Sequence, residues 1–138
     1  PNDRSTNDAA RWIAGEAERR DRGLAVDLVV ADPDHHDDVL GEVGLVVVEP
    51  ARRWAEVGYW LAEPARGRGR ATAALTVFSD WALADLSLRR LFARTSVDNP
   101  AAAAVARGAG YELAGEAGEG MQVWVRDRDV AGTVPPRP

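Results

Sequence analysis

The sequence predicts an α/β fold, of the α+β kind, in which a mostly antiparallel mixed sheet has one parallel strand pair and is flanked by helices. Three segments rich in branched apolar residues follow one another between residues 24 and 62, joined by short polar stretches. Such a series is typical of an antiparallel meander. A helical segment and another strand come next, and a strand–helix–strand unit places its two strands parallel.

The expected elements follow from periodicity and end signals. Leu75, Phe78 and Ala82 recur at the spacing of one helix face. Asn99-Pro100 opens a later helix, with Asn as N-cap and Pro at the first helical position, and Gly108 ends it. The expected helices cover residues 9–22, 71–86 and 100–108. The expected strands cover residues 24–31, 39–48, 54–62, 91–97, 111–114 and 121–126.

Composition limits the chemistry. The 138 residues suit one domain, expected over residues 1–126, with a flexible tail over 127–138. The chain has no cysteine, which excludes disulfides, thiolate metal sites and a cysteine nucleophile, and suits a cytoplasmic protein. All 17 basic residues are arginine, so a Schiff-base or P-loop lysine is excluded. No apolar run approaches 18 residues, so no membrane span is expected.

The most informative stretch is the arginine- and glycine-rich loop Arg66-Gly67-Arg68-Gly69-Arg70-Ala71-Thr72, between an expected strand and an expected helix. A helix N-terminus exposes unpaired N–H groups and carries partial positive charge. Glycines let successive N–H groups converge on an anion. The loop therefore indicates a phosphate or pyrophosphate cradle, with a surface turn of solvated arginines as the alternative.

Two better-known phosphate loops do not fit this stretch. A dinucleotide fingerprint beginning at Gly67 would need glycine at position 72, where the chain has Thr72. A P-loop needs a Gly-Lys-Ser/Thr sequence, which the chain lacks. The net charge of −5 argues against a nucleic-acid partner for the arginines.

Two segments carry a family resemblance: EVGYWLAEPARGRGRAT at 56–72 and TSVDNPAAAAVARGAGY at 95–111. Together they resemble the GNAT superfamily of acyl-CoA N-acyltransferases, and within it the Rim-type protein N-terminal acetyltransferases. The family loop, Arg/Gln-x-x-Gly-x-Gly/Ala, is matched by Arg66, Gly69 and Ala71. The resemblance covers roughly residues 9–126.

The resemblance implies acetyl-CoA as co-substrate and no metal. The loop would bind the pyrophosphate of coenzyme A, and two neighbouring strands would splay to admit the pantetheine arm. The arm would form hydrogen bonds to free backbone groups of Trp60, Leu61 and Ala62. Asn99 would contact the pantetheine or serve only as an N-cap, and Arg107 would lie near the nucleotide or act only as a cation at a helix C-terminus. The implied cofactor-binding residues are Trp60, Leu61, Ala62, Arg66, Gly67, Arg68, Gly69, Arg70, Ala71, Thr72, Asn99 and Arg107.

The implied reaction moves an acetyl group to a primary amine, either a protein N-terminus or a small amine, by direct attack. Glu56, on the strand that leads into the loop, resembles an acidic position common in the Rim-type sequences, and the resemblance makes it the expected general base. Strand alternation puts it on the same face as Gly58 and Trp60. Glu42 is the other candidate. The alternative for Glu56 is an exposed strand carboxylate paired with Arg52 or Arg53.

The chain departs from the family at the two positions where the resemblance implies an acid that protonates the leaving thiolate of coenzyme A. Those positions hold Ala102 and Ala106, which cannot donate a proton. Water could protonate the thiolate, which is a tolerable leaving group, and Ser96 and Tyr111 are the alternative donors. A catalytically inert acyl-CoA-binding or regulatory domain therefore stays open as the alternative function. The family also has a first strand and helix that we expect to be missing or supplied by another chain, which makes a homodimer one option.

His35 and His36 lie among four aspartates in the 32–38 segment. This composition indicates a polar hairpin loop and not a metal site. Adjacent histidines point apart in an extended chain, and no further metal ligand is evident elsewhere in the sequence. Among the aromatic residues, Tyr59 and Trp60 are the ones expected to line a substrate channel.

Overall fold

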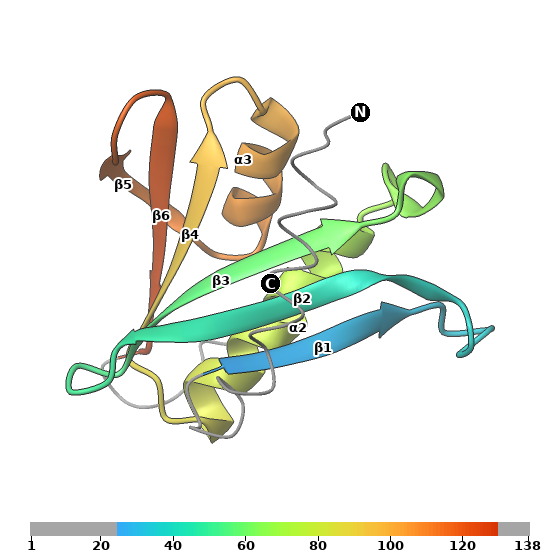
Figure 1. Ribbon diagram of the computed structural model, residues 1–138, viewed down its shortest axis with the longest axis horizontal. Helices are drawn as coiled ribbons and strands as arrows, with labels where there is room; N and C mark the ends of the chain where they lie inside the picture. Colours follow the sequence, from blue (N-terminus) through green and yellow to red (C-terminus); the bar gives the residue numbers. More distant parts are fainter. Residues whose placement is uncertain (1–24, 130–138) are drawn as a thin grey trace.

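The structure is a computed structural model in which residues 25–129 are described. Its centre is a six-stranded sheet with strand order β1-β2-β3-β4-β6-β5, in which every pair except β3–β4 is antiparallel (Figure 1). The strands are β1 (Ala25–Ala31), β2 (Val39–Glu49), β3 (Trp54–Leu61), β4 (Arg90–Ser96), β5 (Glu112–Glu116) and β6 (Met121–Asp127). The predicted meander and the single parallel pair are confirmed.

Two helices cover one face of the sheet. Helix α2 (Arg70–Asp85) lies behind β1–β3 and α3 (Pro100–Gly108) lies beside β4 (Figure 1). The buried residues of α2 are Leu75, Phe78, Ser79, Ala82 and Leu83, the i, i+3, i+4, i+7 and i+8 pattern of one face. They pack on Val43, Leu45, Val57, Leu91 and their neighbours to form the core.

Strands β3 and β4 pair over only three positions, Trp54↔Arg90, Ala55↔Leu91 and Glu56↔Phe92. Beyond Glu56 the two strands separate, and Figure 1 shows them leaving one corner and diverging. β3 keeps β2 as its neighbour up to Leu61, and β4 keeps β6 up to Ser96. The diverging halves therefore leave backbone groups of each strand without a sheet partner.

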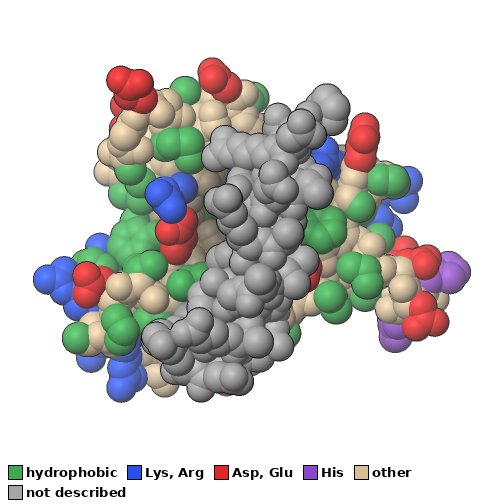
Figure 2. Space-filling view, viewed as in Figure 1, with side chains coloured by type: hydrophobic (Ala, Val, Ile, Leu, Met, Phe, Trp, Pro, Cys, Tyr) green, Lys and Arg blue, Asp and Glu red, His purple; other side chains and the backbone are tan. Residues whose placement is uncertain are grey.

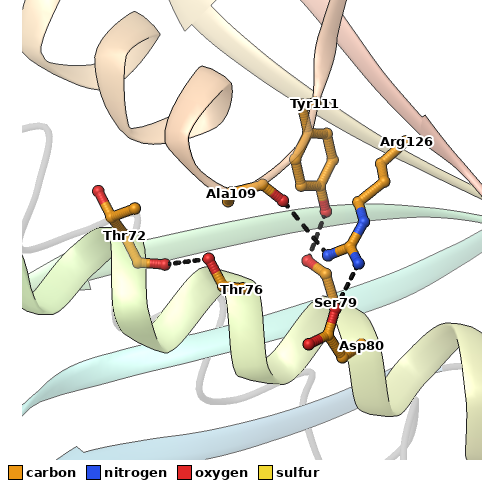
Figure 3. Close-up of polar contacts among 7 residues, drawn as sticks. All are labelled: Thr72, Thr76, Ser79, Asp80, Ala109, Tyr111 and Arg126. Carbon is orange, nitrogen blue, oxygen red and sulfur yellow. Dashed lines mark hydrogen bonds and ion pairs between the residues drawn. The ribbon is translucent and has the colours of Figure 1, made fainter. Parts of the chain in front are cut away.

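A polar clasp, defined here as Ser79, Asp80, Tyr111 and Arg126, joins α2 to the segment after α3 (Figure 3). The hydroxyls of Ser79 and Tyr111 are 2.7 Å apart, and both residues are buried. The Arg126 guanidinium donates to Asp80 and, over 3.3 Å, to the carbonyl of Ala109. Burial raises the pKa of Tyr111 to about 12, against smaller lowering effects of the Ser79 hydroxyl and Arg126.

Most element boundaries match the predictions within one or two residues, with two differences. The predicted loop 63–70 contains a 3₁₀ turn, η1 (Glu63–Ala65). The tail prediction is wrong at Asp127, which ends β6 and receives two hydrogen bonds from Arg90. The predicted helix 9–22 and residues 130–138 lie outside the described residues. Between residues 25 and 129, neither helix has the length and apolar character needed to cross a membrane.

Candidate functional site

A cleft of about 740 Å³ opens where β3 and β4 diverge. Its walls come from the end of β3, the 66–72 loop and first turn of α2, the end of β4, and the first two turns of α3. The structure thus brings the loop, the strand end and Asn99 into one cavity. The residues of the implied cofactor set that line it are Trp60, Leu61, Arg66, Gly67, Gly69, Arg70, Ala71, Thr72 and Asn99.

The loop has the backbone geometry of an anion cradle. Gly67 and Gly69 adopt φ values of +79° and +73°, which favour glycine. Gly69 is the N-cap residue of α2, so no side chain caps this helix, and its first turn holds no acidic residue. The first N–H groups of α2 therefore face the cleft with partial positive charge. A Cβ added at either glycine would meet no atom within 4 Å, so the space above the loop is open.

Two loop arginines add positive charge to the cleft but also have protein partners. Arg66 Nε donates to the carbonyl of Leu61 at 3.0 Å, which ties the loop to the end of β3. Arg70 lies 3.7 Å from Asp32 of the β1–β2 loop. The backbone N–H of Asp34 is the main cause that lowers the pKa of Asp32, and His35 and Arg70 act in the same direction.

The backbone of β3 offers fewer groups to the cleft than the sequence predicts. The N–H of Ala62 donates to Leu40 O at 2.7 Å, so it points toward β2. Backbone groups alternate along a strand, so those of Trp60 also face β2, whereas those of Tyr59 and Leu61 face the gap. The prediction of a free Ala62 amide is wrong, because β2 extends far enough to bond it. Tyr59 is the backbone position that the sequence analysis missed.

The N-terminus of α3 is capped from within. The Asn99 side chain accepts the N–H of Ala102 at 3.0 Å, and Pro100 occupies the first turn. The predicted N-cap is confirmed, and the same residue lines the cleft. Asn99 therefore caps α3 and borders the cleft, and its contact with pantetheine stays a prediction.

The positions at which the family is expected to hold a thiolate acid do face the cleft. Ala102 and Ala106 both line it, without any group that could donate a proton. Ser96 lines the cleft and can serve as a stand-in. Tyr111 cannot, because its hydroxyl is buried against Ser79 and it is not among the cleft-lining residues.

A second cavity, the open-face groove, lies on the sheet face away from the helices and has a volume of about 620 Å³. It shares with the cleft the residues Val57, Gly58, Tyr59, Trp60 and Arg94. The two cavities therefore meet at the divergence of β3 and β4. Tyr59 and Trp60 line both cavities, and their part in a substrate channel stays a prediction.

Both candidate bases lie in the open-face groove and each is held by a neighbour. Glu42 accepts the indole N–H of Trp60 at 3.1 Å. Glu56 accepts two hydrogen bonds from Arg94, Nε to Oε2 at 2.9 Å and Nη2 to Oε1 at 3.1 Å. The expected partners of Glu56, Arg52 and Arg53, are placed elsewhere: Arg52 stacks on Trp54, and Arg53 reaches the carbonyl of Ser87.

Three of the implied cofactor-binding residues, Ala62, Arg68 and Arg107, do not line the cleft. Arg107 lies in the last turn of α3 and stacks its guanidinium over Trp124, 5.2 Å from the ring centroid, which favours its alternative role as a cation at the helix C-terminus. Arg68 is exposed in the loop but does not line the cavity. Arg94 is the site residue that sequence analysis missed, because only the register of β3 against β4 places it next to Glu56.

The histidines of the 32–38 segment lie on an exposed loop at one edge of the molecule (Figure 2). His35 contacts only the nearby Asp32, at 3.8 Å, among the ion pairs of the described part of the chain. Within residues 25–129, no group of three or more His, Asp or Glu side chains is arranged to hold a metal ion.

Comparison with known proteins agrees with this geometry. The family described as acetyltransferase (GNAT) domain matches residues 1–112. The chain is 30% identical over 111 residues to the ribosomal-protein-serine acetyltransferase of Escherichia coli, covering 80% of this chain and 60% of that protein. It is 32% identical over 83 residues to the putative ribosomal N-acetyltransferase YdaF of Bacillus subtilis, covering 60% of this chain and 45% of that protein. The chain thus spans about half the length of these curated relatives.

Solved structures show the same fold. The ribosomal-protein-S5-alanine acetyltransferase of Vibrio fischeri superposes with a TM-score of 0.76 at 23% identity, over 87% of this chain and 70% of that chain. RimL, a ribosomal L7/L12 α-N-protein acetyltransferase solved with coenzyme A, superposes with a TM-score of 0.74 at 24% identity, over 88% of this chain and 72% of that chain. With the family match over most of its length, this chain belongs to the GNAT acetyltransferase family.

Proposed function

We propose that this chain is the catalytic part of an N-acetyltransferase that moves an acetyl group from acetyl-CoA to a primary amine. The observation that carries the proposal is the meeting of two cavities at the divergence of β3 and β4. One cavity has an anion cradle at its rim and the other contains carboxylates. A thioester and an amine entering from opposite faces of the sheet would meet there.

The cleft is suited to the phosphate-bearing substrate. The uncapped N-terminus of α2, with Gly67 and Gly69 in the left-handed region, would hold the pyrophosphate through backbone N–H groups. The gap-facing backbone of Tyr59 and Leu61 would bond the pantetheine amides. Acetyl-CoA supplies the activated acetyl group as a thioester.

The open-face groove is suited to the amine. Among the described residues that line it, the carboxylates Glu42 and Glu56 outnumber the cation Arg94, which favours a positively charged acceptor. In the transfer, the amine nitrogen forms a bond to the acetyl carbon as the carbon–sulfur bond breaks and the thiolate leaves. Glu56 would accept the ammonium proton, and holding both reactants in line would lower the barrier.

The relatives act on two kinds of amine. The E. coli and Vibrio fischeri proteins are ribosomal-protein acetyltransferases, and a Vibrio cholerae relative of the fold is a spermidine N-acetyltransferase solved with coenzyme A and spermine. For this chain we propose a protein N-terminus or a small amine as acceptor. A cytoplasmic location stays a prediction from the cysteine-free sequence.

An inert acyl-CoA-binding domain is the second candidate, because Ala102 and Ala106 line the cleft without a proton donor. Calorimetric titration with acetyl-CoA, followed by a free-thiol assay over amines and N-terminal peptides, separates the two. Binding with thiol release supports the enzyme. Binding without release on any acceptor supports the inert domain, and failure to bind contradicts both.

The variant Glu56→Gln tests the proposed base. We expect acetyl-CoA to bind with unchanged affinity, because Glu56 lines the groove and not the cleft. Turnover should fall by roughly 100- to 10,000-fold, the usual contribution of a general base. Glu42→Gln is the matched comparison, since Glu42 lies in the same groove. A larger loss in Glu42→Gln than in Glu56→Gln would transfer the role to Glu42.

A further inference from the structure

Arg94 lies on β4 where the cleft and the open-face groove meet. It is the one charged residue, in the described part of the chain, that lines both the cleft and the open-face groove. It lies two residues beyond Phe92, the last β4 residue paired with β3. Its guanidinium therefore crosses between the strands at the first step of their divergence.

Arg94 holds the carboxylate of Glu56 in a defined orientation. Both oxygens of Glu56 are engaged, at 2.9 and 3.1 Å, by the two parallel N–H donors of one guanidinium. Such a fork-to-fork pair fixes the plane of the carboxylate as well as its place. The side chain of Glu56 is about one-third exposed and that of Arg94 about half, so the pair borders open space rather than the core.

A second bridge on the same strand gives a built-in comparison. Arg90, four residues earlier on the same face of β4, makes the same two-donor bridge to Asp127 of β6, at 2.6 and 2.9 Å. That bridge joins strands that are fully paired, and neither residue lines the cleft or the groove. The two arginines therefore make the same kind of bridge at different places, and Arg90 also stacks over Trp54, 5.1 Å from the ring centroid.

We propose that Arg94 is the positioning residue of the acyl-transfer centre, holding the Glu56 carboxylate in one orientation where the cleft and the groove meet. This inference rests on the proposed function. It assigns to Arg94 a role in turnover through Glu56 and not in holding the phosphates of acetyl-CoA, which lie at the loop end of the cleft. Without the bridge, Glu56 would be free to rotate away from the amine.

Steady-state kinetics of Arg94→Gln, Arg94→Lys and Arg90→Gln test the assignment. A misplacement of about 1 Å costs on the order of 100-fold in rate, so kcat of Arg94→Gln should fall by roughly that factor. Its acetyl-CoA affinity should stay unchanged. Arg94→Lys keeps the charge without the fork and should recover part of the loss. Arg90→Gln should match the wild type, and equal kcat in Arg90→Gln and Arg94→Gln would overturn the inference.

A readout that needs no turnover completes the experiment. In protein labelled with ¹⁵N-arginine, the Nε–H signals of Arg94 and Arg90 are assigned from the two Gln variants. Acetyl-CoA should shift the Arg94 signal and leave that of Arg90 in place. Binding with an unmoved Arg94 signal overturns the inference alone. A wild type that binds no acetyl-CoA, or releases no thiol with any acceptor, overturns the proposed function and this inference with it.

Discussion

The two helices that border the cleft begin in opposite ways. Helix α3 begins at Asn99, whose side chain accepts the N–H of Ala102, and Pro100 removes one donor. Helix α2 begins at Gly69, which has no side chain to offer, and its first turn holds no acidic residue. In both helices the first backbone N–H groups have no partner within the helix. In α3 the Asn99 side chain accepts a hydrogen bond from one of these groups. In α2 we propose that the acceptor is the pyrophosphate of acetyl-CoA.

Because of this difference, we expect the two helix N-termini in the cleft to contribute differently to stability and to ligand binding. The capped terminus is satisfied without ligand and contributes to stability, whereas the uncapped one gains its partner only when an anion binds. A capping side chain in α2 would compete with the ligand, and removal of the cap in α3 would cost stability. Variants at three positions, Gly69, Tyr111 and Asn99, test the two helix starts and the packing between the helices, from the largest expected effect to the smallest.

Gly69→Asp gives α2 the internal acceptor that it lacks. We expect acetyl-CoA affinity to fall at least 100-fold, because a carboxylate about 4 Å from a phosphate is repelled by about 4 kcal/mol near a protein surface. The fold should persist, since an added Cβ meets no atom within 4 Å and Asp tolerates a positive φ better than most residues. Calorimetric titration with acetyl-CoA measures the loss.

Gly69→Asn is the matched control, because it has the same shape and backbone preference without the charge. It should bind acetyl-CoA at least tenfold more tightly than Gly69→Asp does. This factor is the part of the affinity loss that we attribute to the negative charge of the carboxylate. If both variants bind equally well, or if Gly69→Asp binds as the wild type does, the placement of the phosphates at α2 is wrong.

Tyr111 tests the clasp that keeps the two helices packed side by side. Its pKa is raised from 10.0 to about 12 in the folded chain, so the folded state holds this proton more tightly than the unfolded state. The resulting stability is present below pH 10 and is lost between pH 10 and 12, by about 2–3 kcal/mol in total. Urea unfolding across this range should show the decline.

Tyr111→Phe isolates that contribution, since burial also raises the pKa of the other tyrosine, Tyr59. The variant should be less stable at pH 8, because the Ser79 hydroxyl loses its partner. Its stability should then decline less between pH 10 and 12 than that of the wild type. Parallel declines in the two proteins would show that the Tyr111 hydroxyl is not the group that titrates.

Asn99→Ala removes the cap of α3 and should lower the free energy of unfolding by about 1 kcal/mol. Asn99→Ser keeps a capping oxygen and should retain most of the stability, while losing the amide that faces the cleft. Thermal unfolding and calorimetry of both variants separate the two roles of this residue. If Asn99→Ser binds acetyl-CoA as tightly as the wild type, Asn99 is a cap and no more.

Local signals predicted the fold well. The branched runs, the helix face of Leu75, Phe78 and Ala82, and the Asn99-Pro100 start all depend on neighbours in sequence, and the structure confirms them. The positive φ of Gly67 and Gly69 is likewise a property of glycine in a loop before a helix. The family resemblance in segments 56–72 and 95–111 depends on the same local residues.

Predictions that needed contacts between distant strands were less successful. The alternative role of Glu56 was an ion pair with its neighbours Arg52 or Arg53, whereas the register of β4 puts Arg94 beside it, 38 residues away. It expected a free amide at Ala62, which the length of β2 decides through Leu40. It kept Tyr111 as a proton donor, although packing of α2 buries its hydroxyl against Ser79.

The sequence alone therefore determined the order of the elements between residues 25 and 129, the glycine-rich loop before α2 and the family to which the chain belongs. These depend on backbone preferences and spacing within short segments. Only the tertiary structure decided that β3 and β4 part after Glu56, that the cleft and the groove meet there, and that Arg94 bridges the junction. The reason is that register between distant strands is set by the packing of the whole core, in which a shift of one residue would reverse every side chain.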